Sequence, residues 1–225
     1  MSRWAAALVL SFVFFVQSNA LAQTTAPSTQ PAVALDQTTP RGTLKLFFAA
    51  NAASDGNAMK SLIQAGNPAE DHMIAAICDK RDADRLLTDA LRDKFPKEWP
   101  GDPRAQEESQ LPQIYQKVDA SAQSITGDTA TLKAPDAQAV PLTFKLVNGK
   151  WLMPLGVLVQ DTDPDHLEAN AHQIDVQVKV MRDATADVKA GKYADMTKAV
   201  EDVKERIFDA NVADHAAATQ AATQP

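Results

Sequence analysis

The hairpin-forming stretch at residues 140–159 constrains the fold of this chain more than any other feature. At its centre stands Asn148-Gly149, the preferred loop of a two-residue type I′ turn, in which both central residues take positive φ. This turn fixes the strand register, so that Leu146 is expected opposite Trp151. Side-chain alternation then gathers a large apolar set on one face of the hairpin, which needs a covering layer. The members of this set are Leu142, Phe144, Leu146, Trp151, Met153 and Leu155.

Two weaker strands precede the hairpin, at residues 115–126 and 129–134. They flank Gly127-Asp128, a second two-residue hairpin loop, so the strands would follow one another as an antiparallel meander. Pro154 has no N–H to pair with Thr143, which predicts a bulge, a kink or a strand end at that point. The expected fold class is α+β, with N-terminal helices packed on an antiparallel sheet of about four strands.

Helices are predicted before the sheet. Thr39 caps the first, and Pro40 takes the first helical position, which the fixed φ of proline favours. Residues 54–57 end this helix, and a short second helix follows with Leu62 and Ile63 on its apolar side. This order places helical structure at the start of the folded part of the chain.

A third, longer helix is expected over residues 69–94. Within it, residues 79–85 carry no large apolar side chain, which indicates either a solvated stretch or a break into two helices. Residues 96–112 hold four prolines and many charges, so a loop or covering segment is expected there, with Trp99 as its anchor.

A heptad seam predicts that the C-terminal part of the chain is helical, since its apolar members recur at alternating steps of four and three residues. They are Leu167, Ala171, Ile174, Val178, Met181, Thr185 and Val188. Asp163 would cap this helix and Gly191 would end it, and a last helix over residues 193–210 would complete an antiparallel helical hairpin. Residues 174–180 alternate strictly and also fit a strand, but the seam continues on both sides and favours the helix.

The surface beside the seam needs a partner. Val176 and Val180 widen the apolar stripe beyond what one neighbouring helix covers. The short connection at residues 161–163 favours docking on the same chain, and a homodimer through the exposed stripe is the alternative.

The first residues have the pattern of an export signal. Arg3 precedes an apolar run over residues 4–16, and Ala20-Leu21-Ala22 is a small-x-small cleavage site that would leave Gln23 as the new N-terminus. The apolar run is too short to span a bilayer comfortably, and no second long apolar run follows. The sequence therefore predicts an exported protein, periplasmic or extracellular, without a membrane span after cleavage.

The domain organisation follows from composition. Thr, Gln and Ala dominate the stretches after the signal and at the C-terminus, which cannot bury enough apolar surface to become ordered. The expected parts are a signal peptide (1–22), a disordered linker (23–38), an α+β domain (39–159), a helical hairpin (160–212) and a disordered tail (213–225).

The charge balance argues against some classes of partner. The formal net charge is −7, and removal of Arg3 with the signal lowers it by one, to −8. Acidic and basic residues are interspersed, so neither nucleic acid nor an anionic membrane surface is expected as a partner. The single cysteine, Cys78, excludes a disulfide framework within the chain.

Two passages resemble the nuclear-transport-factor-like cone fold, the group that includes SnoaL-like cyclases and ketosteroid isomerases. Residues 39–63 look like the first two helices of that group, and residues 127–132 and 142–155 look like its later strands. The resemblance implies that the α+β domain over residues 39–159 is cone-like, with helices on a curved antiparallel sheet. In the enzymes of that group, carboxylate, His or Tyr groups act inside the cone. The C-terminal helical hairpin departs from this basic fold.

No residue of the sequence matches such a catalytic group, so no catalytic, cofactor-binding or metal site is assigned. His72 has the character of a surface histidine, and Tyr115 lies near the start of the expected sheet without a specified partner. Cys78 stands among apolar neighbours and is expected to be buried and inert.

Asp161, Asp163 and Asp165 resemble the beginning of a calcium-binding loop. That loop needs Gly at its sixth position and Glu at its twelfth, where this chain has His166 and His172. Acidic residues also suit the N-terminus of the following helix, so no metal site is predicted.

Two functional hypotheses remain. The first is an exported non-catalytic domain that binds a small apolar ligand or a protein partner. The second is a SnoaL-like isomerase, cyclase or hydrolase acting in the cone pocket. A pocket with converging ionisable side chains would favour the enzyme, and a filled cone would favour the binding domain.

Overall fold

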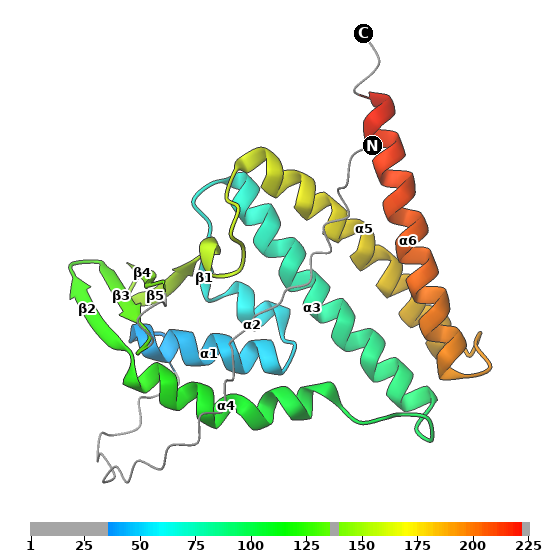
Figure 1. The fold of residues 1–225 in the computed structure, drawn as a ribbon, viewed down its shortest axis with the longest axis horizontal. Helices are drawn as coiled ribbons and strands as arrows, with labels where there is room; N and C mark the ends of the chain where they lie inside the picture. Colours follow the sequence, from blue (N-terminus) through cyan, green and yellow to red (C-terminus); the bar gives the residue numbers. More distant parts are fainter. Residues whose placement is uncertain (1–35, 136–139, 222–225) are drawn as a thin grey trace. The chain divides into compact units, whose positions relative to one another are not determined.

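The computed structural model describes residues 36–135 and 140–221 (Figure 1). Its helices are α1 (Pro40–Ala52), α2 (Gly56–Lys60), α3 (Pro68–Lys94), α4 (Pro103–Ala120), α5 (Pro164–Lys189) and α6 (Met196–Ala221), with a 3₁₀ turn, η1 (Leu155–Val157). Its strands are β1 (Ile63–Gln64), β2 (Ala122–Thr126), β3 (Thr129–Lys133), β4 (Leu142–Val147) and β5 (Lys150–Pro154). The α+β fold class is confirmed. The predicted signal peptide and the predicted linker up to residue 35 lie outside the described residues.

Several helices begin at a polar residue followed by proline. The polar side chain accepts a hydrogen bond from a backbone N–H of the first turn, and proline occupies a position where no intrahelical donor is lost. These pairs are Thr39-Pro40, Asn67-Pro68, Asp102-Pro103 and Asp163-Pro164. Local sequence thus sets the starts of α1, α3, α4 and α5.

The hairpin of β4 and β5 has the turn and the register that the sequence predicts. Asn148 and Gly149 have φ values of 51° and 77°, and Leu146 lies opposite Trp151. Strand β5 ends at Pro154, where the chain passes into η1. The missing N–H of Pro154 therefore coincides with a strand end.

Strands β2 to β5 form the predicted antiparallel meander. The described sheet has five strands instead of about four, in the order β1-β5-β4-β3-β2, and it is mixed. The additional strand, β1, runs parallel to β5 and places Ile63 opposite Met153. Helix α2 ends at Lys60, so Leu62 and Ile63 do not belong to it. The backbone N–H of Met153 donates to the Leu62 carbonyl at 2.9 Å, a pairing that continued helix would not allow.

Helix α4 corrects a second expectation. Residues 103–112 are helical instead of a loop, and residues 115–120 are helical instead of strand. Asp102 caps the helix and Pro103 begins it, whereas Pro112 is tolerated inside it although proline normally interrupts a helix. Helix α4, which the sequence did not predict, therefore lies in the chain between the predicted N-terminal helices and strand β2.

The covered face of the sheet is filled by side chains. Phe144 and Met153 are completely buried, and Trp151 is 5% exposed. Helix α1 contacts β3 and β5, and the buried Thr43 hydroxyl donates to the Trp151 carbonyl at 3.0 Å. Helix and sheet are thus joined by apolar packing and by a buried hydrogen bond.

Helix α5 packs along α3, and every member of the predicted heptad seam is buried. Residues 174–180 are helical, which excludes the strand alternative. The seam was expected to face mainly the last helix, but its principal partner is α3, which runs unbroken through residues 79–85. Helix α5 therefore docks on its own chain through the seam, and the parts predicted as 39–159 and 160–212 are in contact. Val176 and Val180, which widen the stripe, are half-buried, and the docking of that extra surface stays a prediction.

Helix α6 returns beside the C-terminal half of α5, as the predicted helical hairpin requires. Arg206 joins the two helices through an ion pair with Asp187 at 2.8 Å, and the Tyr193 hydroxyl donates to Asp202. Helix α6 continues to Ala221, so most of the tail expected from residue 213 is helical. Alanine, the strongest helix former, dominates this stretch.

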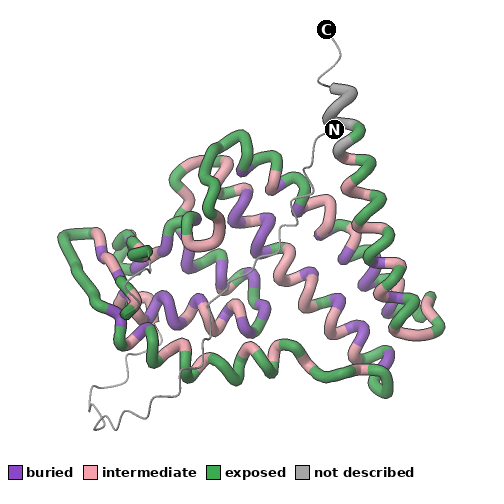
Figure 2. Tube along the Cα trace, viewed as in Figure 1, coloured by how far each residue is buried: buried purple, intermediate pink, exposed green. Residues whose placement is uncertain are grey.

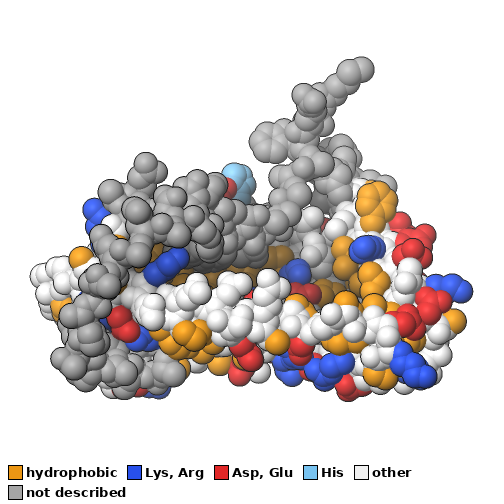
Figure 3. All heavy atoms as spheres, turned by 60° about the horizontal axis from the view of Figure 1, so that its bottom comes forward, with side chains coloured by type: hydrophobic (Ala, Val, Ile, Leu, Met, Phe, Trp, Pro, Cys, Tyr) orange, Lys and Arg blue, Asp and Glu red, His pale blue; other side chains and the backbone are white. Residues whose placement is uncertain are grey.

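The surface carries charges of both signs. On the face shown in Figure 3, Lys and Arg side chains are interspersed with Asp and Glu side chains. Among residues 36–135 and 140–221, no helix is long and apolar enough to span a bilayer.

Candidate functional site

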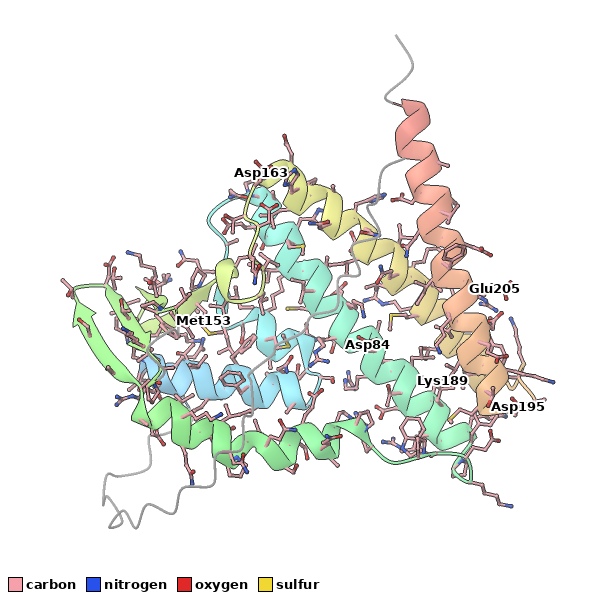
Figure 4. The ribbon with its side chains drawn as sticks, viewed as in Figure 1. Asp84, Met153, Asp163, Lys189, Asp195 and Glu205 are labelled. Carbon is pink, nitrogen blue, oxygen red and sulfur yellow. The ribbon has the colours of Figure 1, made fainter. Side chains whose placement is uncertain are left out.

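A polar pocket between α3 and α4 is the candidate functional site, with a cavity volume of about 210 Å³. Its lining residues are Ser54 from the α1–α2 connection, Arg81, Asp84, Arg85 and Thr88 from α3, and Pro103, Arg104 and Glu107 from α4. Asp84 marks the position of the pocket on α3 in Figure 4. Three guanidinium groups from two helices therefore line one hollow.

The sequence places these side chains through helical spacing. Arg81, Arg85 and Thr88 are four and three residues apart, which puts them on one face of α3. On α4, Arg104 and Glu107 are three residues apart and share a face in the same way. The polar stretch of α3 that lacks large apolar residues is thus the wall of a pocket.

Ser54 brings the α1–α2 connection to the pocket through a helix-ending motif. Its φ is 51°, a left-handed conformation that glycine usually adopts at this position. The Asp55 N–H donates to the Ala50 carbonyl at 2.8 Å, and the Ser54 N–H donates to the Asn51 carbonyl at 3.0 Å. These bonds satisfy the last carbonyls of α1 and hold Ser54 in a buried position.

Arg104 is held firmly by two carboxylates. Its Nη2 lies 2.6 Å from Asp89 Oδ1 and 2.9 Å from Asp102 Oδ2, and its side chain is 18% exposed. The hydrogen bond from Arg104 is the main cause that lowers the pKa of the Asp102 carboxyl. In turn, the hydrogen bonds to Asp102 and Asp89 raise the pKa of the Arg104 guanidinium. Arg104 therefore stays charged at the N-terminus of α4.

The other two arginines have looser carboxylate partners. Arg81 donates to Asn51 Oδ1 at 2.6 Å and lies 3.5 Å from Glu107 Oε2. Arg85 Nη2 lies 3.6 Å from Asp82 Oδ1, which is beyond hydrogen-bond length. Arg81 directs both Nε and Nη2 to Asn51, so its remaining donor is Nη1. Arg85 has more donor capacity for a ligand, because its carboxylate partner is beyond hydrogen-bond length.

The pocket has the chemistry of anion binding. Arginine presents its N–H groups in a planar fork that matches carboxylate and phosphate oxygens. Its two carboxylates are paired with cations, Asp84 with Lys80 at 3.1 Å and Glu107 with Arg81. Its lining residues include neither histidine nor cysteine.

A second hollow lies beside α1 and α2, with a volume of about 330 Å³. It is mainly apolar and is lined by Leu46, Ala49, Ala50, Ala53, Ala58 and Leu62, with Gln37, Asp55 and Ser61 among them. It shares no lining residue with the α3–α4 pocket, although Ala53 and Asp55 are the chain neighbours of Ser54.

The residues considered from sequence do not come together in one site. Cys78 is buried, as predicted, and burial raises the pKa of its thiol to about 12, so it stays protonated. His72 is half-buried between α3 and α5, with Nδ1 2.8 Å from Glu168 and Nε2 2.8 Å from Asp175. Hydrogen bonds to Asp175 and then to Glu168 raise the pKa of His72.

Tyr115 lies on α4, outside the sheet. Its ring centroid is 5.5 Å from Lys45 Nζ, a cation–π distance, and burial raises the pKa of its hydroxyl. Lys45 itself is buried and pairs with Asp119 at 2.7 Å, so this group joins α1 to α4.

The Asp161–Asp165 segment caps a helix. Asp163 accepts hydrogen bonds from the backbone of Asp165 and His166, and the Asp161 carboxylate lies 2.8 Å from the His166 ring. His172 instead pairs with Asp214 of α6. Within the described ranges, no group of three or more His, Cys, Asp or Glu side chains is arranged to hold a metal ion.

Sequence reasoning missed the arginine-lined pocket. Its signal was present at residues 79–85, where the charged face of α3 replaces apolar residues. The other wall of the pocket, which α4 forms, could not be predicted, because the residues of α4 were expected to form a loop and a strand.

Comparisons with known proteins found no relative of this chain. No protein-family model matches the chain, and searches of the curated proteins and of the solved structures found no similar chain.

Proposed function

We propose that this protein is an exported, non-catalytic binding protein whose α3–α4 pocket holds a small anion. The observation that carries the proposal is the convergence of Arg81, Arg85 and Arg104 on one hollow. A carboxylate or phosphate group of the ligand would accept hydrogen bonds from these guanidinium groups.

The acidic lining narrows the class of ligand. Asp84 and Glu107 stand in the same hollow and would repel a ligand that presents only negative charge. A small carboxylate that also bears a hydroxyl or ammonium group suits both the arginines and the acidic side chains of the pocket. Its carboxylate would face the arginines, and its hydroxyl or ammonium group would donate to Asp84 or Glu107. Ser54 and Thr88 offer further hydrogen-bonding groups.

Export is proposed on the pattern of residues 1–22, with Gln23 as the first residue of the exported form. A nuclear-transport-factor-like cone is proposed on the two passages that resemble that group, supported by α1 lying against the sheet. The filled face of the sheet, with Phe144 and Met153 completely buried, favours binding elsewhere over catalysis inside a cone.

The proposal is tested by ligand titration of the full mature chain. Small hydroxycarboxylates, amino acids and inorganic phosphate are titrated by calorimetry and by thermal unfolding. A ligand at about one hundred times its Kd stabilises the native state by about 2.7 kcal/mol, which raises the Tm by several degrees. Arg85→Met should remove this shift, because Arg85 has the loosest carboxylate partner of the three.

Arg182→Met is the matched control. Arg182 is a half-exposed arginine on α5 with one carboxylate partner, Asp79 at 3.2 Å, and it does not line the pocket. The control should bind as the native chain does. The proposal fails if none of the probes shifts the Tm, or if Arg85→Met binds as tightly as the control.

A further inference from the structure

Strand β2 is an edge of the sheet. Within residues 36–135 and 140–221 it pairs only with β3, and all of its residues are exposed (Figure 2). The opposite edge is covered, because the Trp151 N–H donates to the Gln37 carbonyl at 2.8 Å and β1 pairs with the end of β5. The sheet therefore has one edge that bonds to neighbouring segments and one edge, β2, that is exposed.

The backbone of β2 offers hydrogen-bonding groups outward. Thr126 and Thr129 close the two-residue loop at Gly127-Asp128. Hydrogen-bonded pairs alternate along an antiparallel hairpin from such a closing pair. The N–H and C=O groups of Gln123 and Ile125 consequently point away from β3.

Strand β2 lacks the usual protection of an edge. Natural edges are blunted by lysine, proline or inward-pointing charge, and Ala122–Thr126 contains none of these. Ile125, on the same side as its buried neighbour Ala130, is 51% exposed. An uncharged strand with an exposed isoleucine is suited to pairing with another strand.

We propose that β2 pairs antiparallel with β2 of a second copy of this chain, joining two sheets across a two-fold axis at Ser124. In this register Gln123 of each copy faces Ile125 of the other, and these are the residues whose backbone groups point outward. The pairing places no like charges opposite each other, although the chain carries a formal net charge of −7. A two-fold axis makes the same surface patch of each copy face its counterpart, as in most dimers.

The test compares Ser124→Lys with a matched control in the full mature chain. Lysines at position 124 would meet across the two-fold axis and repel. Thr143→Lys adds the same charge at another exposed position on the same face of the sheet, two strands away from the edge, because Thr143 pairs with Thr131 and Thr131 with Ser124. Sedimentation is measured from low to high micromolar concentration, with circular dichroism to verify folding.

The native chain and Thr143→Lys should shift from monomer to dimer with concentration, and Ser124→Lys should remain monomeric. Amide exchange at Gln123 and Ile125 should slow only in the dimer. A native chain that stays monomeric at every concentration overturns the proposal. So does a Ser124→Lys variant that dimerises like the control, since the dimer would then use another surface.

Discussion

Trp151 joins the sheet to the core, to α1 and to the segment before α1. Its side chain is 5% exposed, on the covered face of the sheet. Its carbonyl accepts the Thr43 hydroxyl of α1, and its N–H donates to the Gln37 carbonyl. The side chain thus packs in the core while the backbone fixes α1 and the segment before it.

Replacement Trp151→Ala should lower the free energy of unfolding by roughly 3–5 kcal/mol, the range for truncating a large buried aromatic side chain. Urea denaturation followed by circular dichroism measures the change. Trp99→Ala is the control, because Trp99 is only half-buried and its Nε1 has no hydrogen-bond partner among the described residues. An unchanged midpoint for Trp151→Ala would contradict the structural role.

At this scale, sequence predicts local relations and misses distant ones. Leu146 and Trp151 are joined by a tight turn, so Asn148-Gly149 determines that they pair. The partners of His72 are 96 and 103 residues away, and neighbouring residues give no indication of them. Sequence therefore suggests a surface histidine where the structure has a link between two helices.

Among the elements, the α3–α5 pair carries the greatest share of contacts between helices. The seam of α5 was predictable because apolar residues at heptad spacing must be buried somewhere. Its partner was not, since several helices of this chain have an apolar stripe that fits. Helix α4 was missed for a different reason: it buries only Val118 fully, so it has almost no apolar periodicity, and Pro112 suggested a loop.

The link between α3 and α5 should depend on pH through His72. Both ring nitrogens face carboxylates, so the charged imidazolium, which donates from both, is the form that fits. The pKa of His72 is raised in the folded protein. Its stabilisation is therefore fully present below its ordinary pKa of about 6.5 and is lost as pH rises through the raised value.

The native chain should lose up to about 1 kcal/mol of stability from this contact on passing from about pH 6 to pH 8, because the groups are partly exposed. His72→Gln should flatten the dependence, measured by urea denaturation at each pH. His166→Gln is the control: His166 pairs with Asp161, outside the α3–α5 contact, and its own raised pKa leaves the His72 contribution in place. A slope that His72→Gln leaves unaltered would show that this link does not contribute.

At the scale of the whole molecule, α5 belongs to the core that the N-terminal helices build. Leu167, Ala171 and Val188 are almost completely buried, and Arg182 adds an ion pair to Asp79 of α3. Helix α6 is attached more loosely: Ala199 and Val203 are buried, whereas Phe208 is 67% exposed. The sequence suggested one appended hairpin, but its two helices differ in how much of the core they cover.

Two truncations separate these roles. Truncation after Val159 removes α5 and α6 and exposes the side of α3 that α5 covers, so the remaining chain should lose cooperative unfolding and solubility. Truncation after Ala190 removes only α6, and the remaining chain should unfold cooperatively with a lower midpoint, because the buried seam between α3 and α5 persists. Thermal unfolding by circular dichroism and light scattering measure both. If the chain that ends at Val159 keeps its midpoint and changes only its oligomeric state, then α5 serves association between copies and not the core of its own chain.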